Sequence, residues 1–261
     1  MMPELQLLDG FTLVAYDHIE STNEEAKRLA LDNAPHGTIV LARSQEAGRG
    51  RRGREWVSKP GNLFCSFIVR PDCPLSEAAQ LSFVMAISVA NALVKLLSEN
   101  GAAPIVQCKW PNDILIDGKK VAGILLETAT GSQSKLEGIV AGVGINLQHF
   151  PAETKFPATS LSEQGAPSVT VSAVLEIVCD LFDKWYAIWR TEGFQTIRLA
   201  WLDKAYGLGT PVSAQLASET VSGLFETLDP QGAMILADNG TRRHIAAGDV
   251  YFEDNVLQHA V

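Results

Sequence analysis

Ten consecutive residues, GRGRRGREWV from Gly48 to Val57, hold four arginines and three glycines. Guanidinium groups bind phosphate and carboxylate oxygens in a fork, and glycine lets the backbone close tightly over a ligand. The segment is too rich in glycine for a good helix or strand, so we expect a loop that suits a polyanion. Taken alone, however, such a segment is more often a solvated surface loop or a small nucleic-acid contact.

A second motif, KWPND from Lys109 to Asp113, follows an apolar segment. Pro111 ends the strand that this segment predicts, so Asn112 and Asp113 are displayed just beyond it. On its own the motif is also typical of a turn whose Asn and Asp cap backbone groups. Its occurrence together with Trp56 and the arginines favours a binding site.

The chain as a whole is acidic, with 21 Lys and Arg against 30 Asp and Glu and a formal charge of -9. This balance argues against bulk attraction to nucleic acid or to an anionic membrane, so the arginine cluster is a local feature. The four cysteines form no C-x-x-C pair, the histidines show no ligand spacing, and no secretory signal is recognisable. Polar residues interrupt the apolar stretch 78–97. We therefore expect a reduced, cytoplasmic protein with no membrane span and no structural zinc.

Strands and helices must position these motifs. The capping-box pattern Ser21-Thr-Asn-Glu24 predicts a helix that begins there. Strands are predicted at residues 37–45, 62–70, 105–109, 114–116, 121–127 and 135–147, and helices at 76–100, 169–190 and 194–204. We expect a sheet of about five or six strands, with the basic segment as a loop between the first two of these strands. After Gly207, short segments at 211–215, 221–228, 233–237 and 241–245 alternate with turn signals and predict a small β-barrel.

The ordered set of motifs resembles biotin protein ligase. The motifs are STN at Ser21, the segment from Gln45 through the arginine-glycine loop to Trp56, KWPND, KKVAGILLE at Lys119 and GVGIN at Gly142. The resemblance implies an α+β fold: a mixed, largely antiparallel sheet with helices, of the class II synthetase-like biotin/lipoate ligase type, in residues 1–207. It also implies an SH3-like β-barrel in residues 208–261.

The function implied by the resemblance is a two-step reaction. Biotin and ATP, with Mg²⁺, would form biotinyl-5'-AMP and pyrophosphate. The biotinyl group would then pass to a lysine of a biotin carboxyl carrier domain, for example that of acetyl-CoA carboxylase. Only about ten residues precede Phe11, so we expect the form without the N-terminal DNA-binding domain, with no repressor function and no nucleic-acid partner. Homodimer formation is left open.

The resemblance also assigns site residues. Lys120, Arg51 and Asp113 would be catalytic, with Lys120 on the biotin carboxylate and the α-phosphate. The biotin-binding residues would be Ser21, Thr22, Asn23, Gln45, Gly48, Arg49, Gly50, Arg51, Trp56, Lys120, Gly123, Gly142 and Gly144. The ATP-binding or adenylate-binding residues would be Arg49, Arg51, Arg54, Lys109, Asn112, Lys120 and Asn146. We expect Lys119 to be solvated and the segment 48–56 to become ordered when the adenylate forms.

Several assignments keep an alternative. Ser21 could serve only as a helix cap, Trp56 could be a core residue, and the three strand glycines could mark bulges. Asp113 could act as a base toward the incoming lysine or hold magnesium. Three other functions compete with the biotin ligase: a lipoate or octanoate ligase of the same fold, a nucleic-acid-binding module, and a biotin sensor without catalytic activity.

Overall fold

The structure is a computed structural model of the chain. It describes residue 7 and residues 9–130, 136–152, 154, 156–216 and 218–252. The outer ends of the two predicted domains, at residues 1–6 and 253–261, lie outside these residues, as does the first residue of the predicted strand 135–147. The predicted boundary between residues 207 and 208 falls in the connection between helix α5 and strand β8.

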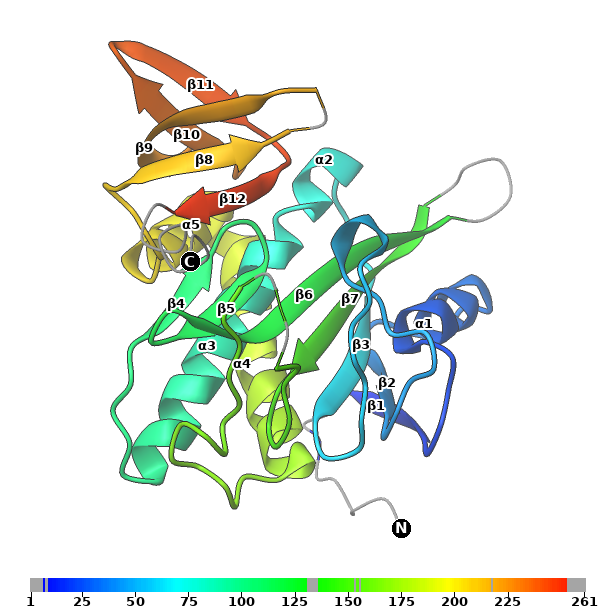
Figure 1. Cartoon of the computed structure of the whole chain (residues 1–261). Coiled ribbons are helices and arrows are strands. Elements are labelled where there is room, and N and C mark those ends of the chain that lie inside the picture. The colour runs from blue at the N-terminus through cyan, green and yellow to red at the C-terminus, as the bar shows by residue number, and fades with distance from the viewer. Residues whose placement is uncertain are drawn as a thin grey trace.

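Seven strands form the main sheet, in the order β1-β2-β3-β7-β6-β5-β4 (Figure 1). Their bounds are β1 Thr12–Tyr16, β2 Thr38–Ala42, β3 Leu63–Val69, β4 Val106–Lys109, β5 Asp113–Ile116, β6 Lys119–Thr130 and β7 Leu136–Ile145. Strands β1 and β2 are parallel, and every other pair is antiparallel. The predicted α+β class with a mixed, largely antiparallel sheet is confirmed. The predicted strand number was too low because β1, a short half-buried edge strand, carries little hydrophobic signal.

Helices cover both faces of this sheet (Figure 1). Helix α1, Thr22–Leu31, packs on β2, β3, β6 and β7, and helices α3, Leu81–Glu99, and α4, Val171–Glu192, pack against each other on the opposite face. Helix α5, Phe194–Asp203, follows α4 and contacts α3. The predicted start of α1 at Ser21 is confirmed, although the Ser21 side chain makes no capping hydrogen bond.

One predicted helix, residues 76–100, is in fact two. Helix α2, Leu75–Ala78, precedes α3. The backbone between them forms 3₁₀-type hydrogen bonds between residues three apart, such as the bond from Phe83 N–H to Gln80 O at 2.9 Å. The buried Gln80 side chain at this step accepts a 2.8 Å hydrogen bond from Trp189 Nε1. The sequence alone does not reveal this break, because the tertiary partner of Gln80 lies on α4.

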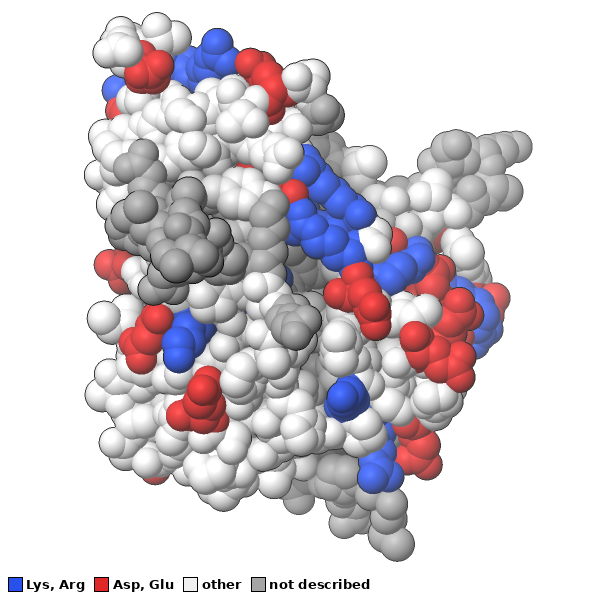
Figure 2. Space-filling view, viewed as in Figure 1, with Lys and Arg blue, Asp and Glu red and all other residues white. Residues whose placement is uncertain are grey.

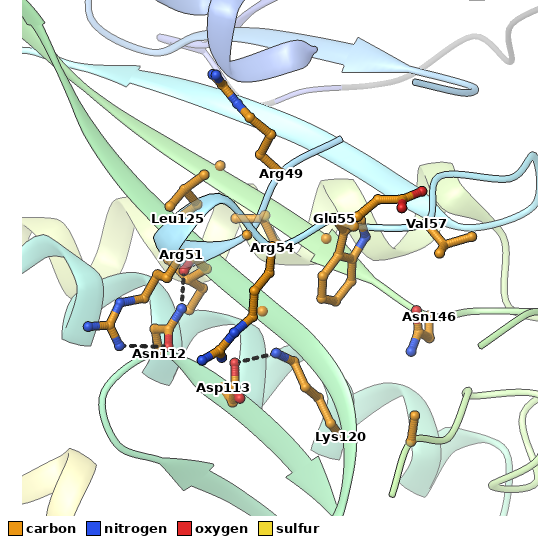
Figure 3. A pocket seen from close by; sticks show the side chains of 18 of the residues that line it. Arg49, Arg51, Arg54, Glu55, Val57, Asn112, Asp113, Lys120, Leu125 and Asn146 are labelled. Atoms are coloured by element: carbon orange, nitrogen blue, oxygen red, sulfur yellow. Dashed lines mark hydrogen bonds and ion pairs between the residues drawn. The ribbon is translucent and has the colours of Figure 1, made fainter. Parts of the chain in front are cut away.

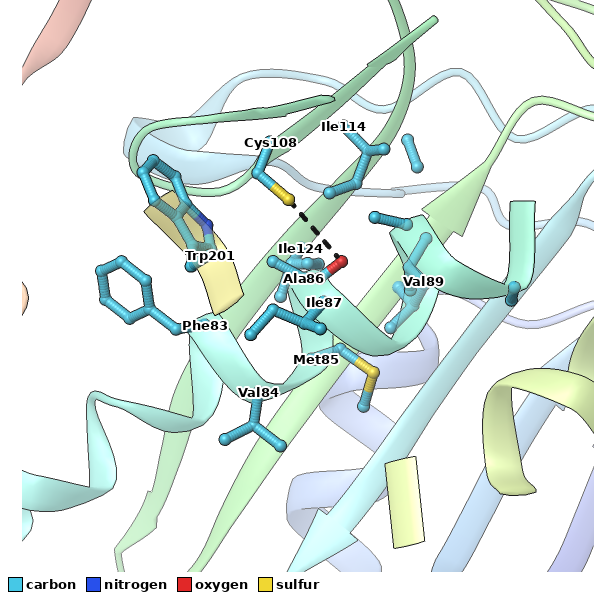
Figure 4. Packing of buried hydrophobic residues seen from close by; sticks show 14 of the residues in the cluster. Phe83, Val84, Met85, Ala86, Ile87, Val89, Cys108, Ile114, Ile124 and Trp201 are labelled. Carbon is cyan, nitrogen blue, oxygen red and sulfur yellow. Dashed lines mark hydrogen bonds between the residues drawn. The ribbon is translucent and has the colours of Figure 1, made fainter. Parts of the chain in front are cut away.

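Helix α3 forms the centre of the hydrophobic core. Its Met85 and Ile87 are fully buried in the same cluster as Ile114 and Ile124 of the sheet (Figure 4). Among the described residues, the stretch from α2 through α3 is the one helical segment long and apolar enough to cross a membrane, and 72% of its most apolar window is buried in the fold. This burial is what the central helix of a packed domain requires.

Five further strands form an antiparallel C-terminal sheet, in the order β11-β10-β9-β8-β12. Their bounds are β8 Pro211–Gln215, β9 Thr220–Leu228, β10 Met234–Asp238, β11 Thr241–Ile245 and β12 Asp249–Phe252. Four of these strands match the segments predicted from the sequence, and β12 was not predicted. This sheet is tied to the rest of the chain by side chains that cross to it: Trp110 Nε1 donates to Gly232 O at 3.1 Å, and Arg198 Nε donates to Leu228 O at 2.6 Å.

Candidate active site

Lysines and arginines gather beside a hollow between the C-terminal sheet and the main sheet (Figure 2). A cavity of about 390 Å³ lies there. Strands β6 and β7, the first turn of α1, the KWPND turn, residues 49–57 and the start of β12 line it. We call residues 48–56 the flap. The predicted motifs, which span more than a hundred residues of sequence, therefore line one cavity.

Three glycines form the floor of the cavity. A Cβ at Gly144 would lie 2.5 Å from Trp56 Cε2, and one at Gly123 would lie 3.1 Å from Trp56 Cζ3. A Cβ at Gly142 would lie 2.1 Å from Asn23 Oδ1. The indole and the Asn23 amide therefore rest directly on the backbone of the two central strands. Because Trp56 is half-buried and lines the cavity, it is available to cover the apolar part of a ligand.

Polar side chains close one end of the cavity. Gln45 Oε1 accepts from the Thr22 backbone N–H at 2.8 Å and lies 3.1 Å from Thr22 Oγ1. The amide nitrogen of Gln45 donates to Ser58 Oγ at 2.9 Å. Ser66, which is fully buried on β3, lies within hydrogen-bond distance of both Thr22 and Asn23. This end is suited to a ligand group that both donates and accepts hydrogen bonds.

Positive charge collects at the other end of the cavity (Figure 3). Lys120 Nζ forms a 2.6 Å ion pair with Asp113 Oδ1 and lies 5.3 Å from the centre of the Trp56 ring. Arg51 Nη1 lies 3.4 Å from Asn112 Oδ1. Burial lowers the pKa of Arg51, and the guanidinium remains protonated at neutral pH because its ordinary pKa is so high. Two cations thus face the same space, which is suited to an anion such as a phosphate.

Lys109 is the third cation, and it is almost completely buried. Its ammonium lies 3.7 Å from the centre of the Phe156 ring and 5.7 Å from that of Phe252. Burial lowers the pKa of Lys109 to about 8, because desolvation disfavours the charged form more than Asp113 and Asp249 favour it. Its charge therefore changes close to physiological pH.

Three of the four flap arginines are held by carboxylates. Arg49 pairs with Glu24 of α1, and it points away from Arg51 and Arg54 in Figure 3. Arg52 Nη1 lies 3.1 Å from Asp249 Oδ2, and Arg54 pairs with the same carboxylate. Ion pairs thus join the flap to helix α1 through Arg49 and to the C-terminal sheet through Arg52 and Arg54.

Comparison with known proteins bears on this arrangement. Residues 15–146 match the profile of the biotin/lipoate A/B protein ligase family, and residues 207–253 match that of the biotin protein ligase C-terminal domain. The chain belongs to the biotin/lipoate protein ligase family. The family predicted from the sequence motifs is therefore confirmed.

Among the family's relatives, the biotin–[acetyl-CoA-carboxylase] ligase of Paracoccus denitrificans is 40% identical over 89% of this chain and 97% of that protein. The bifunctional ligase/repressor BirA of Bacillus subtilis is 37% identical over 92% of this chain and 74% of its own length. A solved structure of the Aquifex aeolicus biotin protein ligase in complex with biotin and ATP aligns with a TM-score of 0.79 and 28% identity. It covers 92% of this chain and 99% of that chain.

All but one of the residues predicted for the ligase site line the cavity. The exception is Gly48, where a Cβ would lie 2.4 Å from Ser58 Oγ and 2.5 Å from Trp56 O. The absence of a side chain at Gly48 therefore lets the start of the flap pack closely against Trp56 and Ser58. Gly48 does not line the cavity. Lys119 is exposed, as predicted. Ser21 lies in the cavity wall without a capping bond, which argues against the cap-only alternative.

The structure adds residues that the sequence analysis did not assign to the ligase site. Asp249 and Phe156 line the cavity, although they lie on β12 and on the long loop after β7. Ser66 and Glu127 contact Asn23 from behind. Glu127 is the last residue of the KKVAGILLE motif, so its place in that motif could have assigned it to the site. No sequence signal marks Asp249, because its partners are nearly two hundred residues away.

Replacing Asp249 with Asn is expected to loosen the flap. Each pair involves partly exposed groups and contributes at most about 1 kcal/mol, so losing the charge should increase flap opening by roughly fivefold. Limited trypsin cleavage at Arg51, Arg52 and Arg54 measures this opening. Glu226→Gln is the matched control, because Glu226 pairs with Arg242 of the same C-terminal sheet and not with the flap. Equal cleavage of both variants would contradict the expectation.

Proposed function

We propose that this chain is a biotin protein ligase that activates biotin with ATP and transfers it to a lysine of a biotin carboxyl carrier domain. The observation that carries the proposal is one cavity with three parts: a polar end at α1, a glycine floor beneath Trp56, and the cations Arg51 and Lys120. These parts correspond to the ureido ring, the apolar body and the phosphate of biotinyl-5'-AMP. The match to the biotin protein ligase C-terminal domain supports the same conclusion.

In the first step, a biotin carboxylate oxygen attacks the α-phosphorus of ATP, and pyrophosphate leaves. Two anions must approach each other, so fixed positive charge at the meeting point lowers the barrier. We assign this role to Lys120 and Arg51. Asp113 holds the Lys120 ammonium through the 2.6 Å ion pair, and we assign it a positioning role in place of a base.

In the second step, the amine of the carrier lysine attacks the carbonyl carbon of the mixed anhydride, and AMP leaves. The anhydride is prone to hydrolysis, so a cover that excludes water before the carrier arrives is useful. We assign this role to the flap and Trp56, which lie over the cavity floor. The ion pairs that hold the flap to Glu24 and Asp249 support the assignment.

Magnesium is expected to accompany ATP, and it remains a prediction. Asp113, the carboxylate predicted for it, is already paired with Lys120. Within the described part of the chain, no group of three or more His, Cys, Asp or Glu side chains is arranged to hold a metal ion. The proposed mechanism needs no protein-bound metal, since Mg²⁺ is commonly held largely by substrate phosphates and water.

We propose a cytoplasmic location, which the four free cysteines support. We propose no role in binding nucleic acid, because Arg49, Arg52 and Arg54 already pair with carboxylates.

A lipoate ligase would share the catalytic fold. A thermal-shift assay with biotin and with lipoate discriminates the two functions, because the true ligand raises the unfolding midpoint of the protein.

The proposal is tested by incubating the protein with biotin, ATP, Mg²⁺ and a carrier domain. Pyrophosphate release measures the first step, and mass spectrometry of the carrier measures the second. We expect one biotinyl group on the carrier lysine. Absence of pyrophosphate release with biotin would overturn the proposal, whereas binding of biotin with no use of ATP would indicate a sensor.

The pH dependence of ATP use is expected to follow Lys109. A pKa of about 8 means that the ammonium is charged below pH 8 and neutral above it. Because kcat/KM reports ionisation of the free enzyme, kcat/KM for ATP should fall as the pH rises through about 8. Lys109→Arg keeps its charge to high pH and should abolish this fall. A fall of the same size in the variant would assign the transition to another group.

A further inference from the structure

Behind the polar end of the cavity lies a chain of hydrogen-bonding side chains that ends on Glu127 of β6. Asn23 Nδ2 lies 2.7 Å from Glu127 Oε2, and Lys27 Nζ lies 3.1 Å from Glu127 Oε1. Ser66 Oγ lies 2.6 Å from Asn23 Oδ1 and 2.8 Å from Thr22 Oγ1. Glu127 does not line the cavity, and it reaches the cavity wall through its hydrogen bond with Asn23 and through Arg49, 3.9 Å away.

Glu127 is ionised at neutral pH. Burial by itself would raise its pKa, but hydrogen bonds from Asn23 and Lys27, together with the charges of Lys27 and Arg49, hold the pKa below its ordinary value. An ionised carboxylate has acceptors only. The Asn23 amide must therefore direct its NH₂ group at Glu127 and its oxygen at Ser66.

The direction of every later bond in the chain follows from this orientation. Asn23 Oδ1 can only accept, so the single hydroxyl hydrogen of Ser66 donates to it. The 2.8 Å contact between Ser66 Oγ and Thr22 Oγ1 must then use the hydrogen of Thr22. With that hydrogen committed, Gln45 Oε1 receives only the Thr22 backbone N–H. Thr22 Oγ1 and Gln45 Oε1 both keep acceptor capacity at the cavity wall.

We propose that Glu127 is a positioning residue that sets the direction of this hydrogen-bond chain, so that the polar end of the cavity selects a ligand with N–H donors. The inference rests on the proposed function, in which the ureido ring of biotin supplies those donors. A lipoyl or octanoyl group has no such donor. The selectivity of the site for biotin therefore depends on a carboxylate that does not contact the ligand.

Glu127→Gln tests this directly. A glutamine amide at this position can donate as well as accept, which lets Asn23 turn over and reverses the chain through Ser66 and Thr22. Discrimination of this kind depends on paired polar groups and is large when they are correctly oriented. We expect the Kd for biotin, measured by titration calorimetry, to rise by about tenfold or more, while the Kd for lipoate stays unchanged.

Glu24→Gln is the matched control. Glu24 pairs with the same Lys27 and Arg49, whereas the Asn23 side chain bonds to Leu125 O, Glu127 and Ser66, so this variant removes the nearby ion pairs and leaves the chain intact. It should keep the wild-type preference for biotin over lipoate. If Glu127→Gln fails to fold, Ser66→Ala interrupts the same hydrogen-bond chain between Asn23 and Thr22. This variant should also reduce the preference for biotin over lipoate.

The outcomes are distinguishable. A preference for biotin that falls in Glu127→Gln or Ser66→Ala, and not in Glu24→Gln, supports the proposal. Equal preference in the Glu127 and Glu24 variants, or an equal loss of both ligands, overturns it. A wild-type protein that binds no biotin would instead contradict the proposed function.

Discussion

Replacing Lys120 with Ala is expected to reduce the rate of pyrophosphate release with biotin and ATP by about 10²–10³-fold. Removing one fixed charge that stabilises a transition state has an effect of this size. The loss is aggravated here, because Asp113, 2.6 Å from the ammonium, would be left as an unpaired carboxylate beside the incoming triphosphate. Both kcat and kcat/KM should fall, because the charge acts where the two anions meet.

Lys119→Ala is the control for Lys120→Ala. The two lysines are adjacent on β6, and alternate residues of a strand face opposite sides, so Lys119 is exposed while Lys120 lines the cavity. The Lys119 variant should retain wild-type pyrophosphate release. A Lys120 variant with near-normal activity would remove this residue from the proposed mechanism and leave the family membership intact.

Replacing Gly144 with Ala is expected to weaken biotin binding and adenylate formation by about 10²-fold. Three atoms of the Trp56 indole lie within 2.8 Å of the position that the new Cβ would occupy. The indole would have to move off the strand, and the flap that carries it would move as well. A displacement of about 1 Å of a positioning group has an effect of this magnitude.

Gly138→Ala is the matched control on the same strand. A Cβ there would meet Val69 O at 3.4 Å, an ordinary contact. Calorimetric titration with biotin should give a wild-type Kd for Gly138→Ala and a much higher Kd for Gly144→Ala. Unchanged binding in the Gly144 variant would show that Trp56 does not have to rest on β7 for the ligand to bind.

Local sequence signals were sufficient for much of the fold. An Asp-Gly pair such as Asp117-Gly118, between the predicted strands 114–116 and 121–127, is typical of a tight hairpin turn, and both residues have the positive φ angles that such a turn requires, 47° and 76°. Helices α4 and α5 were predicted within two residues of their ends. Signals of this kind depend on neighbours along the chain, which the sequence contains in full.

Signals that depend on distant partners were missed or misjudged. Strands β1 and β12 are short and lie at the edges of their sheets, and the break between α2 and α3 depends on the contact of Gln80 with Trp189. In each case the deciding partner lies elsewhere in the chain.

The sequence by itself determined the family, the fold class and a set of site residues that, apart from Gly48, line the cavity, because ordered motifs carry that information. Only the tertiary structure decided how these residues are held. It paired the flap arginines with Asp249 and Glu24, buried Lys109 between Phe156 and Phe252, and set Glu127 behind Asn23. Charge pairing, desolvation and hydrogen-bond direction depend on distances in space, and those distances exist only after the sheet and its loops have packed together.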